Sequence, residues 1–315
     1  MADIVTITIN PSIDASTSVE QLVPIHKLRC TSARRDPGGG GINVARVVKR
    51  FGADATAIYA MGGVLGQLLR HLLDQEGIPG LPVPISEETR EDFTVVEGVS
   101  GQQYRFILPG PRLSEREWRA FLDTFASHAS REQGTRFVVA SGGLPPGVPE
   151  DFYGRIVRTT KQVGAKIIVD TSGPPLKAAL EAGVFIVKPS LREFRELMEA
   201  PLKTERDQVA ACRSLVESGQ AEVVALTLGD QGALLVARDK VLRALAVPIK
   251  PISVVGAGDS FLGAMICRLA SGHSIEDAFR YGIAAGSAAL LLPGTELCRR
   301  EDAERLVGEV KVQAI

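Results

Sequence analysis

The chain has 315 residues, of which 45% are hydrophobic and 23% are charged, so it can bury a large core and has the composition of a globular protein. Its 36 basic and 37 acidic side chains nearly cancel, so no overall charge attracts nucleic acid or an anionic membrane. Any anionic ligand must therefore be held by local charges.

No segment is typical of a membrane or a secreted protein. No apolar run reaches the roughly 18 to 20 residues that cross a bilayer, and the apolar start of the chain alternates with threonine instead of forming a leader. The four cysteines (Cys30, Cys212, Cys267 and Cys298) are scattered and predict free thiols in a reducing compartment. We therefore expect a cytoplasmic protein with neither nucleic acid nor membrane as a partner.

Apolar runs rich in β-branched residues alternate with amphipathic stretches along the chain. Such alternation predicts a mainly parallel sheet flanked by helices, whose ligands lie beyond the carboxyl ends of the strands. Strands are predicted at 4–9, 56–61, 137–141, 166–170, 184–187 and 223–228. Helices are predicted at 42–51, 65–76, 150–163, 193–200, 204–218 and 261–269.

Two segments, at about 12–35 and 81–108, break this alternation with short runs of mixed polar and β-branched residues. They predict strands of a small sheet that is inserted in a single α/β domain spanning residues 1–315. A small sheet with one apolar face is marginal alone, so it would cover a ligand or a second copy of itself. We expect it to act as a lid and as the contact of a homodimer.

Asp14 follows the first predicted strand, where a carboxylate can accept two sugar hydroxyls or simply close an Asx turn. Lys27, Arg90 and Arg105 lie in the two irregular segments. Each of them alone is typical of a solvated surface charge. Together they suit a phosphate clamp, because arginine binds phosphate through two parallel hydrogen bonds.

Four consecutive glycines at 38–41 lead directly into a predicted amphipathic helix. Such a run costs backbone entropy, a cost usually tolerated where a ligand must touch the main chain, although a flexible surface loop is the alternative. Asn43, on the first turn of the helix, can hydrogen-bond sugar hydroxyls with both ends of its amide.

Lys188, Ser190 and Glu193 follow the strand predicted at 184–187. The spacing of Ser190 and Glu193 is that of a capping box, and spacing alone favours this structural explanation. The alternative is that Glu193 holds Mg²⁺ through water beside substrate phosphates. Further along, the segment 227–232 ends another strand with glycines, which fits a nucleotide-binding loop or a plain hairpin turn.

The most informative segment is Ser253 to Ser260, where Gly256, Ala257 and Gly258 precede Asp259 at the start of an apolar helix. The first amides of a helix have no intrahelical partner and favour an anion, and glycine lets a phosphoryl group approach the backbone. Asp259 can also be an ordinary helix N-cap, which is the commoner reason for such a turn taken alone.

With these elements in this order, the chain resembles the ribokinase-like (PfkB) carbohydrate kinases over essentially its whole length. Two patterns at opposite ends of the chain carry the resemblance: the glycine and asparagine segment at 38–52, with Gly62 beyond it, and the segment 256–259. The resemblance implies a ribokinase-like α/β fold with a small β lid. It also implies ATP- and Mg²⁺-dependent phosphorylation of a sugar hydroxyl.

Within the family, the resemblance is greatest to the members that phosphorylate fructose 6-phosphate in glycolysis, and it implies a homodimer. The segments 27–31, 101–106, 141–147 and 294–298 carry this part of it. The chain departs from the family pattern at Ser190, where the motif usually has Asn, and at Val254, where many members have Thr. These departures leave the acid and base residues in place and alter the contacts to ATP and its metal.

The resemblance implies a role for each candidate residue. Asp259 would accept the proton of the attacking hydroxyl, beside an anion hole formed by the amides of Gly256, Ala257 and Gly258. The sugar would be held by Asp14, Gly39, Gly40, Asn43 and Ser141, and its phosphate by Lys27, Arg90 and Arg105. ATP would be bound by Lys188, Ser190, Thr227, Gly229 and Gly232, and its metal by Glu193.

Three other functions compete with this one. A kinase for tagatose 6-phosphate or fructose 1-phosphate would use much the same basic clamp. A non-catalytic sugar-phosphate-binding protein on the same fold would have no need of Asp259. A Rossmann dehydrogenase is disfavoured, because no strand is followed by Gly-x-Gly-x-x-Gly with an acidic residue about 20 positions later.

Overall fold

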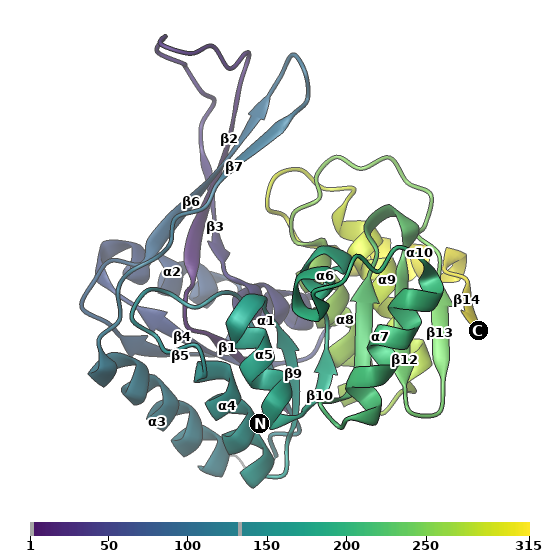
Figure 1. Cartoon of the computed structure of the whole chain (residues 1–315). Helices are drawn as coiled ribbons and strands as arrows, with labels where there is room; N and C mark the ends of the chain where they lie inside the picture. Colours follow the sequence, from purple (N-terminus) through teal and green to yellow (C-terminus); the bar gives the residue numbers. More distant parts are fainter. Residues whose placement is uncertain (1–2, 132–133) are drawn as a thin grey trace.

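The computed structural model describes residues 3–131 and 134–315, and its strands form two sheets of ten and four strands (Figure 1). The order of the large sheet is β14-β13-β12-β11-β10-β9-β8-β1-β4-β5, and it is parallel from β5 to β11 and antiparallel from β11 to β14. Its strands are β1 (Ile4–Thr8), β4 (Ala55–Met61), β5 (Gly80–Pro84), β8 (Phe137–Ser141), β9 (Lys166–Asp170), β10 (Val184–Val187), β11 (Ala221–Thr227), β12 (Ala233–Ala237), β13 (Val241–Ala244) and β14 (Val312–Ala314).

Helices cover both faces of the large sheet. One hydrophobic core joins it to α1, α2, α8, α9 and α10, and a second core on the opposite face joins it to α3, α4, α5, α6 and α7. The helices are α1 (Gly40–Arg50), α2 (Gly63–Gln75), α3 (Glu115–Arg131), α4 (Phe152–Gln162), α5 (Gly173–Ala182), α6 (Leu191–Met198), α7 (Glu205–Glu217), α8 (Ala257–Ala270), α9 (Ile275–Ala289) and α10 (Arg300–Leu306), with short 3₁₀ turns η1 (Gly229–Gln231) and η2 (Val307–Glu309). Within the described ranges, none of these helices is long and apolar enough to cross a bilayer.

The small sheet stands out from the body of the molecule (Figure 1) and has the order β3-β2-β6-β7. Its strands are β2 (Ser12–Val19), β3 (Arg34–Gly38), β6 (Arg90–Glu97) and β7 (Gln103–Phe106). Side chains alternate between two faces. In the strand register Asp14 is opposite both Asp36 and Asp92, and Arg105 is opposite Thr94, two residues after Asp92, so these side chains share one face of the sheet. We call this face the inner face and the opposite one the outer face.

The expected fold class, a mainly parallel sheet flanked by helices with a small β-sheet, is confirmed. Every strand and helix predicted in the alternating part of the chain is present, with ends shifted by a few residues. The second irregular segment needs a correction, because residues 81–84 belong to β5 and pair with β4 in the large sheet. The single domain predicted over 1–315 also includes residues 1–2 and 132–133, which lie outside the described residues.

Helix α9 is one of the elements that the sequence analysis did not predict. Seven of its fifteen residues are alanine or glycine. Small residues serve close packing here: a Cβ added at Gly282 would lie 3.0 Å from the ring of Phe261 on α8. The packing of α9 thus holds α8, which carries Asp259, against the sheet.

Candidate active site

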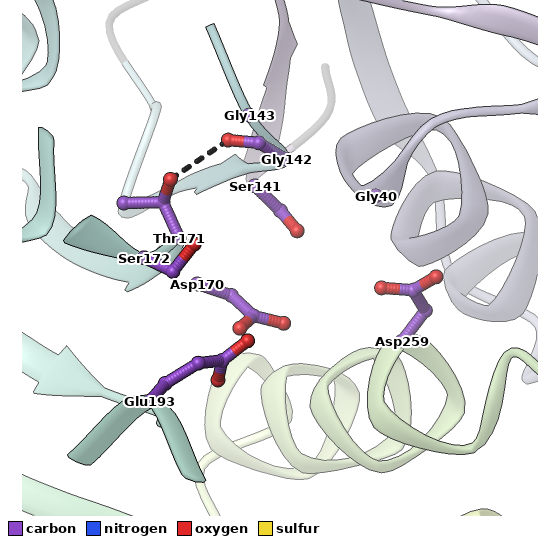
Figure 2. A pocket seen from close by; sticks show the side chains of 9 residues that line it. All are labelled: Gly40, Ser141, Gly142, Gly143, Asp170, Thr171, Ser172, Glu193 and Asp259. Atoms are coloured by element: carbon purple, nitrogen blue, oxygen red, sulfur yellow. Dashed lines mark hydrogen bonds between the residues drawn. The ribbon is translucent and has the colours of Figure 1, made fainter. Parts of the chain in front are cut away.

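A cavity of about 220 Å³ lies beyond the carboxyl ends of β8 and β9. This is the edge at which parallel α/β sheets bind ligands. Figure 2 shows the side chains that line it, with the carboxylates of Asp170, Glu193 and Asp259 directed into the same space. The lining residues are Gly40, Ser141, Gly142, Gly143, Asp170, Thr171, Ser172, Glu193 and Asp259.

Asp259 lies in the first turn of α8, and its Oδ2 accepts a hydrogen bond of 2.9 Å from Nδ2 of Asn43 on α1. The N-cap position is taken by Gly256 in the left-handed conformation (φ 73°), and no side chain caps the helix. Asp259 is therefore not the N-cap, which removes the structural explanation for it. Its carboxylate is left to face the cavity.

Burial raises the pKa of Asp259 to about 7, and the neighbouring Asp170 carboxylate adds to the rise. The amide of Asn43 and the charge of Lys188 act in the opposite direction. A carboxylate with a pKa near neutrality is matched to general-base work, because it accepts a proton readily yet is still largely ionised above pH 7.

Lys188 lies just after β10, and its Nζ is 3.0 Å from Oδ2 of Asp170 at the end of β9. Both side chains are mostly buried. Burial by itself would lower the pKa of Lys188, but the carboxylates of Asp170, Asp259 and Glu193 together hold that pKa above its ordinary value. The ammonium therefore stays charged beside the turn at 256–258, where a Cβ on Gly258 would lie 3.3 Å from Nζ.

Sequence analysis missed Asp170 as a site residue. The signal was available, since Asp170 is a carboxylate at the carboxyl end of a buried strand, as Asp14 was taken to be. Its neighbours Thr171 and Ser172 also line the cavity, and Thr171 Oγ1 donates to the carbonyl of Gly142 at 2.9 Å (Figure 2). These residues form the wall opposite Asp259.

The glycine run at 38–41 is ordered structure, not a flexible surface loop: Gly38 ends β3, and α1 begins at Gly40. Gly39 has a φ of 105° and lies against the side chain of Thr8. A Cβ on Gly40 would lie only 2.1 Å from Oγ of Ser141, the residue that ends β8. The glycine run therefore lets the start of α1 lie directly against the end of β8 at the edge of the cavity.

A second group of candidates lies on the inner face of the small sheet. Asp14 accepts a hydrogen bond of 2.6 Å from Ser12, and it lies within β2, so it does not close an Asx turn. Burial raises the pKa of Asp14, and the charge of Asp92 adds to the rise, whereas Arg105 and Arg90 lower it. A Cβ on Gly38 would lie 2.3 Å from Oδ1 of Asp14, and Gly40, two residues further on, lines the cavity, so the inner face and the cavity adjoin each other.

Arg90 begins β6, with Nη1 3.2 Å from Oδ2 of Asp92 and 2.6 Å from the carbonyl of Leu108. Its Nε is buried and makes no hydrogen bond with the described residues. Arg105, on β7, is exposed, but its charge reaches Asp14. Lys27 is exposed on the connection between β2 and β3, and none of the contacts described for residues 3–131 and 134–315 joins it to the two arginines. Its role stays a prediction.

On the other side of the cavity, Ser190 and Glu193 do form a capping box at the start of α6. The amide and the hydroxyl of Ser190 both donate to Oε2 of Glu193 at 2.8 Å. Both of these bonds fall on one oxygen, and Glu193 still lines the cavity. The capping and ligand roles are therefore compatible in geometry.

The segment 227–232 joins β11 to the antiparallel β12 through η1, so the hairpin description is correct for the backbone. Thr227 Oγ1 donates to the carbonyl of Pro189 at 3.3 Å and so lies beside Lys188 and Ser190. Gly229 has a φ of 62° and open space around it. At Gly232 (φ 94°) a Cβ would also lie 2.2 Å from the carbonyl oxygen of Ala244, so backbone conformation and packing both require glycine there, and its role toward ATP stays a prediction.

Among the described residues, no three acidic, histidine or cysteine side chains are grouped so that they could hold a metal ion by themselves. Mg²⁺ is usually bound by only one or two carboxylates, together with water and substrate phosphates. The oxygen-only donors of Asp170 and Glu193 in one cavity fit that mode of binding.

A family model described as pfkB family carbohydrate kinase matches residues 1–302. The chain is 45% identical over 302 residues to the ATP-dependent 6-phosphofructokinase isozyme 2 of Mycobacterium tuberculosis (strain CDC 1551 / Oshkosh), covering 96% of this chain and 88% of that protein. It is 41% identical over 307 residues to the isozyme 2 of Escherichia coli (strain K12), covering 97% and 98%. The solved structure of phosphofructokinase-2 from Escherichia coli in complex with fructose-6-phosphate matches with a TM-score of 0.91 at 39% identity, covering 98% and 99% of the two chains.

Proposed function

Because the chain belongs to the pfkB family of carbohydrate kinases, we propose that it is a 6-phosphofructokinase, which transfers the terminal phosphoryl group of ATP to fructose 6-phosphate and forms fructose 1,6-bisphosphate. The observation that carries the proposal is the position of Asp259. Its carboxylate faces the cavity at the start of α8, beside the backbone amides at 256–258, and the inner face of the small sheet, with Arg90 and Arg105, lies nearby. Base, anion site and phosphate-binding charges therefore adjoin one another.

In this reaction Asp259 accepts the proton of the sugar's free primary hydroxyl as that oxygen bonds to the terminal phosphorus and the bond to the ADP oxygen breaks. The amides of Gly256, Ala257 and Gly258 and the ammonium of Lys188 stabilise the negative charge on the moving group. Gly39, Gly40, Asn43 and Ser141 hold the sugar beside Asp259. Asp14 accepts its hydroxyls, while Arg90, Arg105 and Lys27 bind the phosphate that the sugar already carries.

ATP occupies the side of the cavity formed by Lys188, Ser190, Thr227 and Gly229. When bound, Mg²⁺ neutralises charge on the ATP phosphates. Glu193 and Asp170 are the residues that fit it, through water or directly. The hydroxyl of Ser190 caps α6 in place of the usual family Asn, so the start of α6 keeps its geometry without the amide.

An ADP-release assay with ATP and Mg²⁺ tests the proposed function against fructose 6-phosphate, tagatose 6-phosphate, fructose 1-phosphate, fructose and ribose. We expect the highest kcat/KM with fructose 6-phosphate. Preference for tagatose 6-phosphate or fructose 1-phosphate would correct the substrate, and preference for an unphosphorylated sugar would refute the phosphate clamp. Absence of turnover with all five would favour a non-catalytic sugar-phosphate-binding protein.

The acid limb of the pH profile is a direct consequence of the pKa of Asp259. A protonated carboxyl cannot accept the hydroxyl proton, so we expect kcat/KM to fall about tenfold per pH unit below pH 7. The Asp170→Asn variant should shift this limb to lower pH, because it removes a negative charge that raises the pKa of Asp259. The wild type and the variant are assayed on the same substrate, so ionisation of the sugar phosphate affects both pH profiles equally. Coincident limbs would show that Asp259 is not the group being titrated.

We also propose that the protein is a homodimer, formed through the outer face of the small sheet. The support is an apolar surface: Phe93, Tyr104 and Phe106 are exposed to 41%, 37% and 53% and lie on that face. A monomer rarely leaves such a set of aromatic side chains in water. Sedimentation at micromolar concentration should show a dimer, which Phe106→Glu converts to a monomer. The control is Ile315→Glu, also at an exposed apolar residue (52%), and dissociation by this variant as well would contradict the assignment of the face.

A further inference from the structure

The small sheet also makes polar contacts with two loops that flank the start of α8, around residues 253 and 295. Thr295 Oγ1 donates a hydrogen bond of 3.2 Å to Oδ2 of Asp36 on β3, and both residues are buried. Next to this bond, Arg34 of β3 is paired with Glu296. We use the name polar seam for three contacts: Asp36 with Thr295, Arg34 with Glu296, and Gln103 with Ser253.

The third contact of the polar seam lies at Ser253, three residues before Gly256. Its Oγ is 3.3 Å from Oε1 of Gln103 on β7, and it donates to the carbonyl of Gly294 at 2.8 Å. The same hydroxyl accepts a bond of 3.2 Å from the amide of Val255. Ser253 thus ties together the small sheet, the loop before α8 and the loop at 294.

Both loops support the turn that carries the anion hole. A Cβ on Gly256 would lie 2.7 Å from Cδ2 of Leu297, so Leu297 packs directly against the turn. The amide of Cys298 donates a bond of 3.2 Å to Oγ of Ser260, in the first turn of α8. A displacement of the loop at 295–298 would therefore move the amides at 256–258.

Asp36 also contacts the helix that orients the base. Its Oδ1 lies 3.5 Å from Nη2 of Arg46 on α1, a side chain only 1% exposed. Arg46 in turn donates a bond of 2.9 Å to the carbonyl of Pro37, and its helix carries Asn43, the donor to Asp259. Asp36 is thus a residue of the small sheet that contacts both α1 and the loop supporting the anion hole.

We propose that Asp36 and Thr295 are positioning residues that couple the two substrates: a sugar phosphate bound on the inner face fixes the small sheet, and the polar seam then fixes the amides at 256–258 for the transferable phosphate. The inference rests on the proposed function. Coupling between two binding sites is reciprocal, so each ligand must strengthen the binding of the other by the same factor. If the polar seam only stabilised the fold, each ligand would bind with the same affinity whether or not the other was bound.

Calorimetric titration of the wild-type protein with a non-hydrolysable ATP analogue, with and without saturating fructose 6-phosphate, measures the coupling as a ratio of two dissociation constants. The test variant is Thr295→Val, which keeps the shape and removes the donor to Asp36. We expect the ratio to fall about tenfold, the scale of a hydrogen bond to a charged group, with little change in analogue affinity when the sugar phosphate is absent. The steady-state counterpart is a higher KM for ATP at a nearly constant kcat.

The matched control is Thr160→Val, which removes another buried threonine hydroxyl, bonded to the carbonyl of Ile156 within α4. It should leave the ratio unchanged. Should Thr295→Val not fold, Ser253→Ala tests the third contact and is expected to lower the ratio as well. A wild-type ratio of one, or a ratio that survives the variants, would overturn the coupling. Wild-type turnover of fructose 6-phosphate is measured on the same preparation, and its absence would refute the proposed function instead of the seam.

Discussion

Replacing Asp259 by asparagine is expected to lower kcat about a thousandfold while the affinity for ATP changes little. Asparagine has the same shape, and its amide oxygen can still accept the 2.9 Å bond from Asn43, so the geometry at the start of α8 is kept. What is lost is the ability to accept the hydroxyl proton. Steady-state turnover and titration with a non-hydrolysable ATP analogue separate these two effects.

The control for this variant is Asp123→Asn on the exposed side of α3, which makes the same chemical change far from the cavity. It should have wild-type turnover. Should Asp259→Asn retain kcat within a few-fold of the wild type, Asp259 would not be the base. The acid limb below pH 7 would then need another titrating group.

The Lys188→Met variant is expected to reduce both stability and turnover. It leaves the mostly buried Asp170 carboxylate without the ammonium that lies 3.0 Å away, and breaking a buried ion pair typically costs about 3–5 kcal/mol of unfolding free energy. It also removes a positive charge from beside the amides at 256–258, so we expect kcat to fall about a hundredfold or more. Denaturant unfolding and turnover of the same preparations measure the two losses.

Two further variants separate these effects. Lys49→Met breaks an exposed ion pair of 2.8 Å with Asp54, in which the side chains are 41% and 60% exposed, and it should cost less than about 1 kcal/mol. The double variant Lys188→Met with Asp170→Asn removes both buried charges, so it should regain part of the stability but none of the turnover. Recovery of turnover in the double variant would show that Lys188 acts only through Asp170.

Six of the ten strands of the large sheet were predicted from the sequence, because their signals are local. The run at 166–170 is apolar and β-branched, and the stretch at 204–218 has helical periodicity with a capping residue at its start, so each segment indicates its own conformation. Helix α9 was not predicted, and the reason for its alanines and glycines is seen only in the structure, where they allow close packing against α8. Strand β5 was placed in the wrong sheet, because a short strand does not specify its partner.

In the candidate site, too, some residues could be identified from the sequence and others only from tertiary contacts. Gly256 to Asp259 could be identified from the sequence, since a small-residue turn before an apolar helix has a defined chemistry wherever it occurs. Asp170 could have been listed as a candidate because it is a carboxylate at a strand end, but its role depends on Lys188 at 3.0 Å and on its effect on the pKa of Asp259, which only the tertiary structure shows. The choice between a capping box and a ligand at Glu193 likewise depended on whether α6 begins beside the cavity.

By itself the sequence determined six strands and six helices of the alternating part of the chain, which turn offers amides and a carboxylate to a phosphate, and the resemblance to the carbohydrate kinases. These properties depend on residues that are neighbours in the chain. Only the tertiary structure decided that Asn43 contacts Asp259, that Gly40 approaches Ser141 and that Asp36 meets Thr295. Such contacts join residues up to 259 positions apart, and the sheet order and helix packing that create them are set by the burial of the whole core, not by any local pattern.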